Sequence, residues 1–584
     1  MVRTEATARE TGHTDTSNRR APSWVTFVGL GVAIVILIVF RRHAFELPLE
    51  TDECNYAYIG ARLLAGDRLY VDVWDHQPPG VFVLFAAAIR FLGDEPPVFR
   101  WMALGFSALS LILIFGVANR VAGRSAGLIA ALLFAVVSSD PGTGGEGCNR
   151  EIYMNALILA GVYCIIRGCG IGHCSGGRAD CNSGEIGFGA TKKSPFTPPE
   201  MGWLIIAGFA FAFASYLKTV AALPWSALAV MAVTGGRRIT GKPPGKRVGV
   251  RGLIAFSIGP ALLWTAATAH FTATHRLSEF YDAVFLANVG YVETGESFWV
   301  RFFRFFRPLR HPLVFESALP LWIVAGISLV GLVYVAIRRR DRGVALLVGL
   351  ALGCFLAVCL PGRFWPHYYY LLIPATVLLA AIGCAKFNQV LQSLRLIGGR
   401  SEFGAVAAGV VVLTAATWTE ARDYLRQPPF GITVDRYNSR DFWGRAQGEN
   451  VARVTDPTDK VFVFSNDASI YYYSGRRCAS RYTMITGLAA GIPGAEERRR
   501  ILLQELGADP PRVIVVSFDE KPFDGWLEFL ERYYGQAVGV DNHDTSETRG
   551  PILLVFARKD RPIPMIDWDW DRKSVGGWDP RNPP

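Results

Sequence analysis

Two adjacent carboxylates, Asp52 and Glu53, stand shortly after the first long apolar stretch of the chain. Ionised groups close to a lipid bilayer cost free energy, so a chain usually keeps them there for function. A carboxylate in this position can take a proton from an attacking hydroxyl group. It can also simply stabilise the N-terminus of the helix that follows. Both interpretations of the pair are open from these residues alone.

Further polar residues border other apolar stretches and fall into three sets: Asp75-His76-Gln77-Pro78-Pro79; Glu151 with Asn149 and Arg150; and Lys218 with Arg363 and His367. If the sets meet at one surface, they suit a reaction in which one group loses a proton and an anion leaves. A carboxylate would then act as the base, and the cations would fit a phosphate leaving group.

Structural roles for the same residues are the alternative. Glu151 could cap a helix, and Lys218 could extend its ammonium group to the membrane interface. Arg363 and His367 could belong to an aromatic belt at the interface, together with Trp365.

The composition of the chain indicates a membrane protein. Of its 584 residues 51% are hydrophobic, and its mean hydropathy is +0.25. The net charge of +10 would suggest nucleic acid only if Lys and Arg shared one soluble face. They lie mostly in short loops between apolar runs, where they set the orientation of the spans, so we expect no nucleic-acid partner.

The expected membrane spans number eleven and cover residues 24–40, 98–118, 126–139, 151–167, 202–216, 219–234, 251–270, 316–337, 343–361, 368–385 and 404–418. Basic clusters such as Arg338 to Arg340 mark the cytoplasmic loops. One consistent solution puts the N-terminus inside and the C-terminus outside. All the polar sets described above then meet at the outer face.

Two segments are expected to lie along the outer membrane surface. Residues 80–92 are short of the roughly 20 residues that a span needs, and counting them as a span would reverse all later loops. We therefore expect an interfacial helix after Pro78-Pro79. The run from Arg301 to Arg310 (RFFRFFRPLR) carries Arg at every third position, and we expect its Phe side chains to face lipid and its Arg side chains the headgroups.

The predicted architecture is mainly α: a polytopic transmembrane domain over 21–419, followed by a soluble extracytoplasmic α/β domain over 420–558. Within the second domain, strands are expected at 461–465, 512–517 and 552–557, with helices near 495–507 and 524–533. The flanking predictions are a disordered cytoplasmic tail (1–20), an outer-face loop (41–97), a cytoplasmic insert (168–200) and an irregular tail (559–584).

The ten cysteines are scattered. Cys169, Cys174 and Cys181 with His173 could form a metal site, but no C-x-x-C pair occurs, and an irregular loop with free thiols is the better interpretation. Cys54 and Cys148 both fall on the outer face, so a disulfide between them is open.

The order of these features resembles the polytopic GT-C glycosyltransferases. A span, Asp52-Glu53, a Pro-Pro interfacial element and an acidic residue opening a later span follow one another as in that family. The resemblance is to bacterial members similar to dolichyl-phosphate-mannose protein mannosyltransferases and to the aminoarabinose transferase of lipid A. The run RFWPHYYYLLIP at 363–374 and the run at 462–481 are similar to segments of these proteins.

The resemblance implies a polyprenyl-phosphate sugar donor, used on the outer face of the bacterial inner membrane. The acceptor would be a hydroxyl group of a glycan, lipid or protein, and a single displacement would invert the anomeric configuration. A divalent metal is left open, and no other cofactor is implied. A polytopic transporter or flippase, or a structural protein that has kept this fold, are the alternatives.

Site roles follow from the same resemblance. Asp52 takes the place of the catalytic base, Glu53 would orient it, and Glu151 matches the second acidic position. Where the family carries Lys-Pro-Pro or Glu-Pro-Pro, this chain has Gln77-Pro78-Pro79. His76 would then replace the missing charge. The candidates for holding the lipid phosphate are Lys218, Arg363, His367 and His76.

Overall fold

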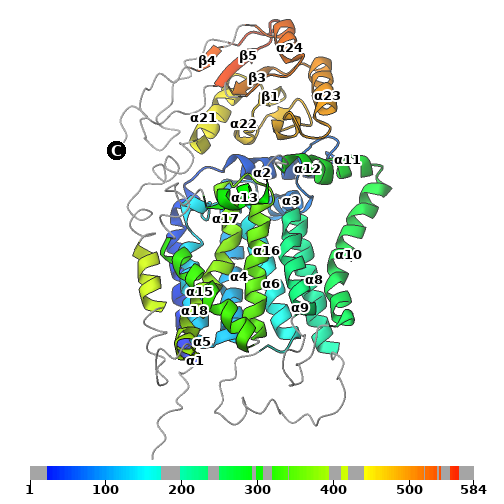
Figure 1. Cartoon of the computed structure of the whole chain (residues 1–584). Helices are drawn as coiled ribbons and strands as arrows, with labels where there is room; N and C mark the ends of the chain where they lie inside the picture. The colour runs from blue at the N-terminus through cyan, green and yellow to red at the C-terminus, as the bar shows by residue number, and fades with distance from the viewer. Residues whose placement is uncertain are drawn as a thin grey trace, which may run out of the picture.

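A computed structural model describes residues 23–171, 198–234, 249–292, 297–306, 319–339, 341–393, 409–418, 440–517, 520–535, 538–540 and 553–563. The predicted tail 1–20, most of the insert 168–200, and the chain after 563 lie outside the described residues. The described chain forms a helical bundle with an α/β domain at one end, and short helices lie between the two (Figure 1).

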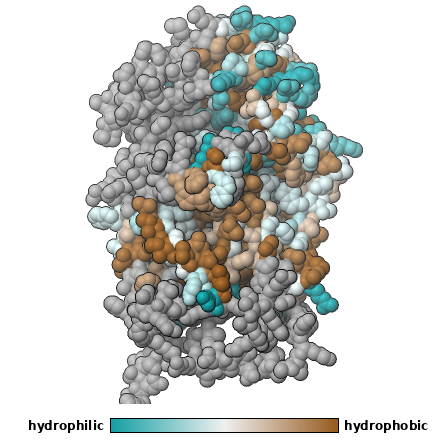
Figure 2. All heavy atoms as spheres, viewed as in Figure 1, coloured by the Kyte–Doolittle hydropathy of each residue, from teal (hydrophilic) through white to brown (hydrophobic). Residues whose placement is uncertain are grey.

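Within the described part of the chain, seven helical stretches are long and apolar enough to cross a membrane. They are α4 (Pro96–Ala122), α6 (Arg150–Gly168), α8 (Pro198–Leu217), α10 (Val250–Ala273), α15 (Leu319–Arg339), α16 (Arg342–Cys359), and the run from α17 (Pro366–Tyr369) through the 3₁₀ turn Tyr370–Leu372 into α18 (Ile373–Ser393). Hydrophobic side chains cover much of the visible bundle, as transfer into lipid requires (Figure 2).

The remaining expected spans correspond to shorter apolar helices: α1 (Ser23–Phe40), α5 (Arg124–Val137), α9 (Ala222–Thr234) and the helix Gly409–Trp418. The total of eleven spans therefore stays a prediction. Within the bundle α6 and α18 are largely enclosed, whereas α10 and α15 expose most of their surface. This difference places α6, which begins at Arg150 and Glu151, in the interior.

The interface between bundle and domain contains helices that run across the bundle axis (Figure 1). They include α2 (Thr51–Leu64), α3 (Gly80–Leu92), α11 (Leu277–Tyr281), a π turn (Asp282–Leu286), α12 (Ala287–Tyr291) and α13 (Phe298–Phe305). Residues 80–92 are thus a short helix in this layer, as their length predicted. Gly80 brings α3 against α8, because a Cβ there would lie only 2.4 Å from the carbonyl oxygen of Tyr216.

The α/β domain is built on a five-stranded sheet of order β2-β1-β3-β5-β4. Its strands are β1 (Lys460–Phe464), β2 (Arg477–Cys478), β3 (Val513–Ser517), β4 (Val538–Val540) and β5 (Leu553–Ala557). β1 runs parallel to β2 and β3, whereas β5 pairs antiparallel with β3 and β4. The three expected strands are present, and so are the two expected helices, as α23 (Ala495–Ala508) and α24 (Trp526–Tyr533).

Two helices and both edge strands of this domain were not predicted: α21 (Arg440–Arg453), α22 (Ser469–Ser474), β2 and β4. The central strands are buried on both faces, and the Trp526 ring stacks on Phe464 with centroids 4.3 Å apart. The domain is docked on α2: Thr51 donates to the carbonyl of Asn466 at 3.0 Å, and the Tyr58 hydroxyl accepts from the backbone of Cys478 at 2.8 Å.

Candidate active site

The two neighbouring acids of α2 lie in different environments, because successive residues of a helix point about 100° apart. Glu53 is fully buried, and its carboxylate lies 2.9 Å from Nη1 of Arg100 in α4. It also accepts hydrogen bonds from the backbone N–H groups of Glu50, at 3.0 Å, and of Cys148. Burial alone would raise the pKa of Glu53, but Arg100 and the two N–H groups outweigh it and hold the pKa below its usual value.

Asp52 is partly exposed and, in the described part of the chain, makes no hydrogen bond or ion pair. The neighbouring acids differ from it. Glu53 is bound to Arg100, Asp75 accepts from Asn55, and Glu151 is bound to Lys218. Asp52 is therefore the acid of this group whose oxygens can accept a proton without first losing a partner.

Lys218 and Glu151 form a buried ion pair. Nζ of Lys218 lies 2.8 Å from Oε1 of Glu151, which opens α6 beside Arg150. Lys218 lies between α8 and α9 and has an extended backbone conformation. Its side chain is buried in the bundle. Burial lowers the pKa of the Lys218 ammonium group to about 8, against the opposing effects of Glu151 and Asp52. The ammonium group is thus charged at neutral pH.

The loop before α3 carries a second buried carboxylate. Asp75 accepts from Nδ2 of Asn55 at 2.7 Å and from the backbone N–H of Gln77 at 2.8 Å. Burial raises the pKa of Asp75 to about 7, although these hydrogen bonds and Arg150 act in the other direction. Asn55 follows Asp52 by three residues, so both face the same side of α2.

His76 lies beside this carboxylate as a neutral ring. Its Nε2 is 2.7 Å from Nε2 of Gln77, so the Gln77 amide donates and the imidazole proton belongs on Nδ1. Burial, together with Arg150, Lys218 and Arg498, lowers the pKa of His76 to about 3. The imidazole can therefore donate a hydrogen bond to a phosphate but does not supply the charge that Gln77 lacks.

Two tyrosines connect the remaining candidates. The hydroxyl groups of Tyr291 and Tyr368 lie 3.1 Å apart, and Nζ of Lys218 lies 3.6 Å from the centroid of the Tyr368 ring. The His76 ring stacks on Tyr291 with centroids 5.0 Å apart, and the exposed guanidinium group of Arg363 is also 5.0 Å from that ring.

His367, at the start of α17, is buried with Nδ1 4.0 Å from Oε1 of Glu50. Its neighbour Tyr368 is the residue that contacts Lys218. The structure therefore brings all the predicted site residues to one end of the bundle, and Lys218 and Glu151 form an ion pair there.

Sequence reasoning missed several residues of this cluster. Arg100, the partner of Glu53, could have been found, because it is a charge at the start of an apolar run. Asn55 and Tyr291 carry no such signal, and their roles depend on contacts made by distant segments.

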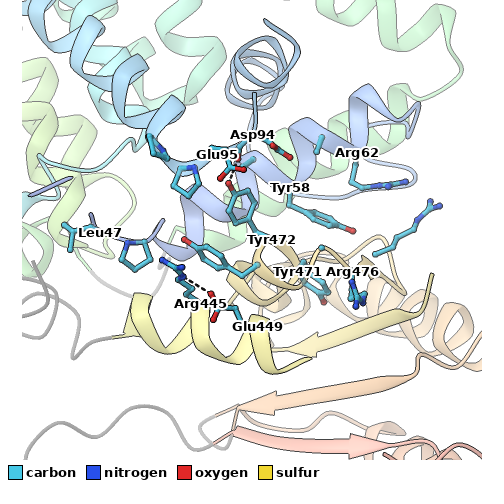
Figure 3. A pocket seen from close by; sticks show the side chains of 18 of the residues that line it. Leu47, Tyr58, Arg62, Asp94, Glu95, Arg445, Glu449, Tyr471, Tyr472 and Arg476 are labelled. Carbon is cyan, nitrogen blue, oxygen red and sulfur yellow. Dashed lines mark hydrogen bonds and ion pairs between the residues drawn. The ribbon is translucent and has the colours of Figure 1, made fainter. Parts of the chain in front are cut away.

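Two cavities lie beside the cluster, and neither is lined by a predicted site residue. The larger, of about 700 Å³, is lined by residues of α2, α21 and α22 (Figure 3). Tyr58, Tyr472 and Arg445 project into it, and Tyr472 donates to the backbone carbonyl of Asp94. The smaller, of about 440 Å³, lies between α3, α8 and α10.

Metal ligation was left open from the sequence. Among the described residues, no group of three or more His, Cys, Asp or Glu side chains is arranged to hold a metal ion. The acids around Asp52 are instead occupied by Arg100, Asn55 and Lys218, so no step is assigned to a metal. Cys54 and Cys148 are both buried free thiols rather than a disulfide, and Cys174, Cys181 and His173 lie outside the described residues.

No protein-family model and no curated protein matches the sequence. The structure is similar to the aminoarabinose transferase ArnT from Cupriavidus metallidurans, solved bound to undecaprenyl phosphate, with a TM-score of 0.56 and 16% identity over 92% of this chain and 98% of that chain. The apo state of ArnT gives a TM-score of 0.55 and 15% identity over 91% and 97%.

A second similarity is to the oligosaccharyltransferase AglB from Archaeoglobus fulgidus, in complex with an inhibitory peptide and a dolichol-phosphate. It gives a TM-score of 0.47 and 13% identity over 93% of this chain and 75% of that chain. At these identities the similarity to ArnT concerns the fold, which extends over nearly the whole of both chains.

Proposed function

Because the chain has the GT-C fold, we propose that it is a membrane glycosyltransferase that moves a sugar from a polyprenyl-phosphate donor to an acceptor hydroxyl group. The acceptor belongs to a cell-surface glycan, a lipid or a protein, and transfer takes place at the outer face of the bacterial inner membrane. The similarity to ArnT, which was solved with undecaprenyl phosphate, supports the class of donor.

The observation that carries this proposal is that the Asp52 carboxylate has no hydrogen-bond partner among the described residues. It is the partly exposed carboxylate without a hydrogen-bond partner in a cluster whose other acids are occupied. A general base needs free oxygen lone pairs facing the proton that it removes. Asp52 meets this requirement, whereas Glu53 is closed off by Arg100 and two backbone N–H groups.

The proposed reaction is a single displacement. The acceptor oxygen attacks the anomeric carbon while its proton passes to Asp52. The bond between that carbon and the phosphate oxygen breaks, and polyprenyl phosphate leaves with the electron pair. Attack and departure on opposite faces of the carbon invert its configuration. Glu53 acts indirectly, because its bonds to Arg100 and Glu50 fix the first turn of α2.

The leaving phosphate requires positive charge that is already in place. Lys218 supplies it from the interior, where Glu151 and the Tyr368 ring hold its ammonium group. Arg363 supplies it from the exposed side, anchored by its Nε 3.3 Å from the Tyr291 carbonyl oxygen. His76, stacked on Tyr291, and His367, edge-on to Tyr368, contribute as polar imidazoles.

The direct test replaces Asp52 by Asn, which keeps the shape of the side chain and removes the base. General-base assistance is typically worth 10²–10⁴-fold, so kcat for transfer from a polyprenyl-phosphate sugar should fall by about that factor. The melting temperature in detergent should stay unchanged, because Asp52 has no partner to lose.

Asp94→Asn is the matched control. Asp94 is an exposed carboxylate at the larger cavity, where only its backbone carbonyl is hydrogen-bonded. This variant should keep its kcat. Near-normal transfer by the Asp52→Asn variant in reconstituted vesicles would refute the assignment of the base.

A further inference from the structure

The α/β domain reaches into the active site through one hydrogen-bond chain. Oγ1 of Thr483 donates to Oδ1 of Asn55 at 2.7 Å, and Nδ2 of Asn55 donates to Oδ2 of Asp75 at 2.7 Å. The other oxygen of Asp75 accepts from the backbone N–H of Gln77 at 2.8 Å. This chain therefore runs from the α/β domain through α2 to the loop that carries His76.

We propose that Thr483 is a positioning residue of the α/β domain, which fixes the Asn55 amide and thereby holds the Asp75–Gln77 loop in its active geometry. The inference deepens the proposed function and rests on it. It assigns the α/β domain a part in catalysis, although none of its residues need touch the substrate.

The hydrogen bonds from Thr483 to Asn55 and from Asn55 to Asp75 are shielded from water. Thr483 is 0% exposed, Asn55 1% and Asp75 5%, so water does not replace a missing partner at these atoms. Buried polar groups without a hydrogen bond are strongly disfavoured. The three side chains therefore constrain one another.

The orientation of the Asn55 amide is the critical element. An amide presents one oxygen acceptor and one NH₂ donor, and both oxygens of Asp75 accept, Oδ2 from the Asn55 amide and Oδ1 from the Gln77 backbone N–H. The NH₂ group must therefore face Asp75, which turns Oδ1 toward the α/β domain. Thr483 supplies the hydroxyl donor that this oxygen needs. Without that donor Oδ1 of Asn55 is a buried acceptor with no hydrogen bond from Thr483, and the amide is held on one side only.

The same segment of the domain holds the loop at its other end. The backbone N–H of Trp74 donates to the carbonyl of Arg481 at 2.8 Å, and the Trp74 ring packs edge-on against Tyr482 with centroids 5.6 Å apart. The Tyr70 hydroxyl donates to the Gln77 carbonyl at 2.7 Å. Residues 481–483 thus contact the loop beside His76 through both backbone and side chains.

The experiment compares Thr483→Val with Thr483→Ser. Valine keeps the shape and removes the hydroxyl group, whereas serine keeps the hydroxyl group. Small displacements at an active site can cost about 10²-fold in rate. We expect Thr483→Val to lower kcat by about 10- to 100-fold with little change in the KM for the donor, and Thr483→Ser to restore most of the rate.

Thr486→Val is the matched control, because Oγ1 of Thr486 makes the same kind of bond, 2.6 Å to Oδ1 of Asn466, within the α/β domain. This variant should keep the kcat of the parent protein. A kcat of Thr483→Val within twofold of the parent would overturn the inference, as would an equal loss in Thr483→Ser or in Thr486→Val.

A second measurement does not depend on activity. Amide hydrogen exchange at Gln77, whose N–H is bonded to Asp75, should accelerate at least about tenfold in Thr483→Val and stay unchanged in Thr486→Val. If the parent protein transfers no sugar, the proposed function fails while exchange still decides the role of Thr483. Unchanged exchange at Gln77 in Thr483→Val would overturn that role.

A double variant covers the case in which valine affects folding. Asp75→Asn acts at the far end of the same chain, so Thr483→Val combined with Asp75→Asn should lose no more rate than the more damaging single change. Fully multiplied losses would show that the two residues act independently and would contradict the inference.

Discussion

At the scale of residues, the proposed site depends on which carboxylates are already paired with a cation or a hydrogen-bond donor. Glu53 and Asp52 are neighbours in sequence, yet one is enclosed by Arg100 and the other is unpartnered. Sequence reasoning assigned the acceptor proton to Asp52 and a supporting role to Glu53. This division stays a prediction, and the structure adds Arg100, which binds Glu53 and which sequence reasoning did not include.

Lys218 gives a pH dependence whose sign is set by its lowered pKa of about 8. Its ammonium group is charged below that pH and neutral above it. Since a neutral amine cannot stabilise the departing phosphate, kcat/KM should fall as pH rises through about 8. The measurement is kcat/KM for the donor between pH 6 and pH 10.

Lys218→Arg is the comparison for this pH profile. A guanidinium group stays charged over the whole range, so this variant should lose the alkaline fall even if its maximal rate is lower. An alkaline fall at the same pH in Lys218→Arg would mean that another group causes it.

At the scale of elements, α2 organises the site. Its first turn carries Asp52 and Glu53 and its next turn carries Asn55, and the side with Thr51, Asn55 and Tyr58 packs on the α/β domain. Gly60 allows α3 to approach, because a Cβ there would lie 2.9 Å from the backbone nitrogen of Ala86. The helix is therefore fixed on two sides by different parts of the chain.

Glu53→Gln should destabilise this element. The change leaves the buried guanidinium group of Arg100 without its counter-charge, and breaking a buried pair in this way costs about 3–5 kcal/mol. The melting temperature in detergent should fall markedly for Glu53→Gln and stay constant for Asp52→Asn, which is the same kind of substitution one residue earlier. Equal melting temperatures for the two variants would contradict the role given to the Arg100 pair.

Hydrophobic length and charge pattern were sufficient to predict the long helices, the short helix at 80–92, and three strands and two helices of the α/β domain. They were not sufficient for β2, whose two residues carry no periodicity. Candidate site residues could be named from the sequence where a charge interrupts an apolar run, as at Lys218 and Glu151. Uncharged members such as Asn55 and Thr483 act through pairing across more than 400 positions, which no local pattern encodes.

At the scale of the whole molecule, the α/β domain and the polar site share one end of the bundle (Figure 1). Besides the contacts of α2, Arg498 of α23 forms an ion pair with Asp282 at 2.7 Å, so the domain also contacts the layer of short helices. These contacts place the domain on the same side of the membrane as Asp52. The proposed orientation requires this side to be the outer one.

Cysteine labelling tests that orientation. Thr274 and Arg251 are exposed residues at opposite ends of α10, and Glu528 is exposed on α24. In intact cells a membrane-impermeant maleimide should label Thr274→Cys and Glu528→Cys. It should label Arg251→Cys only after the membrane is permeabilised, with the parent protein as the background. Labelling of Arg251→Cys in intact cells would reverse the topology.

The edge strand β2 also affects whether the α/β domain stays monomeric when it is produced without the bundle. β2 ends the sheet on one side, and its outer side is covered by α2, where Tyr58 accepts from Cys478, and by the loop after α2, where Asp67 pairs with Arg477 at 3.3 Å. Removing the bundle would uncover this edge, and uncovered edges pair with other chains. Domain fragments produced without α2 should therefore self-associate, so the bundle serves the α/β domain as protection against aggregation.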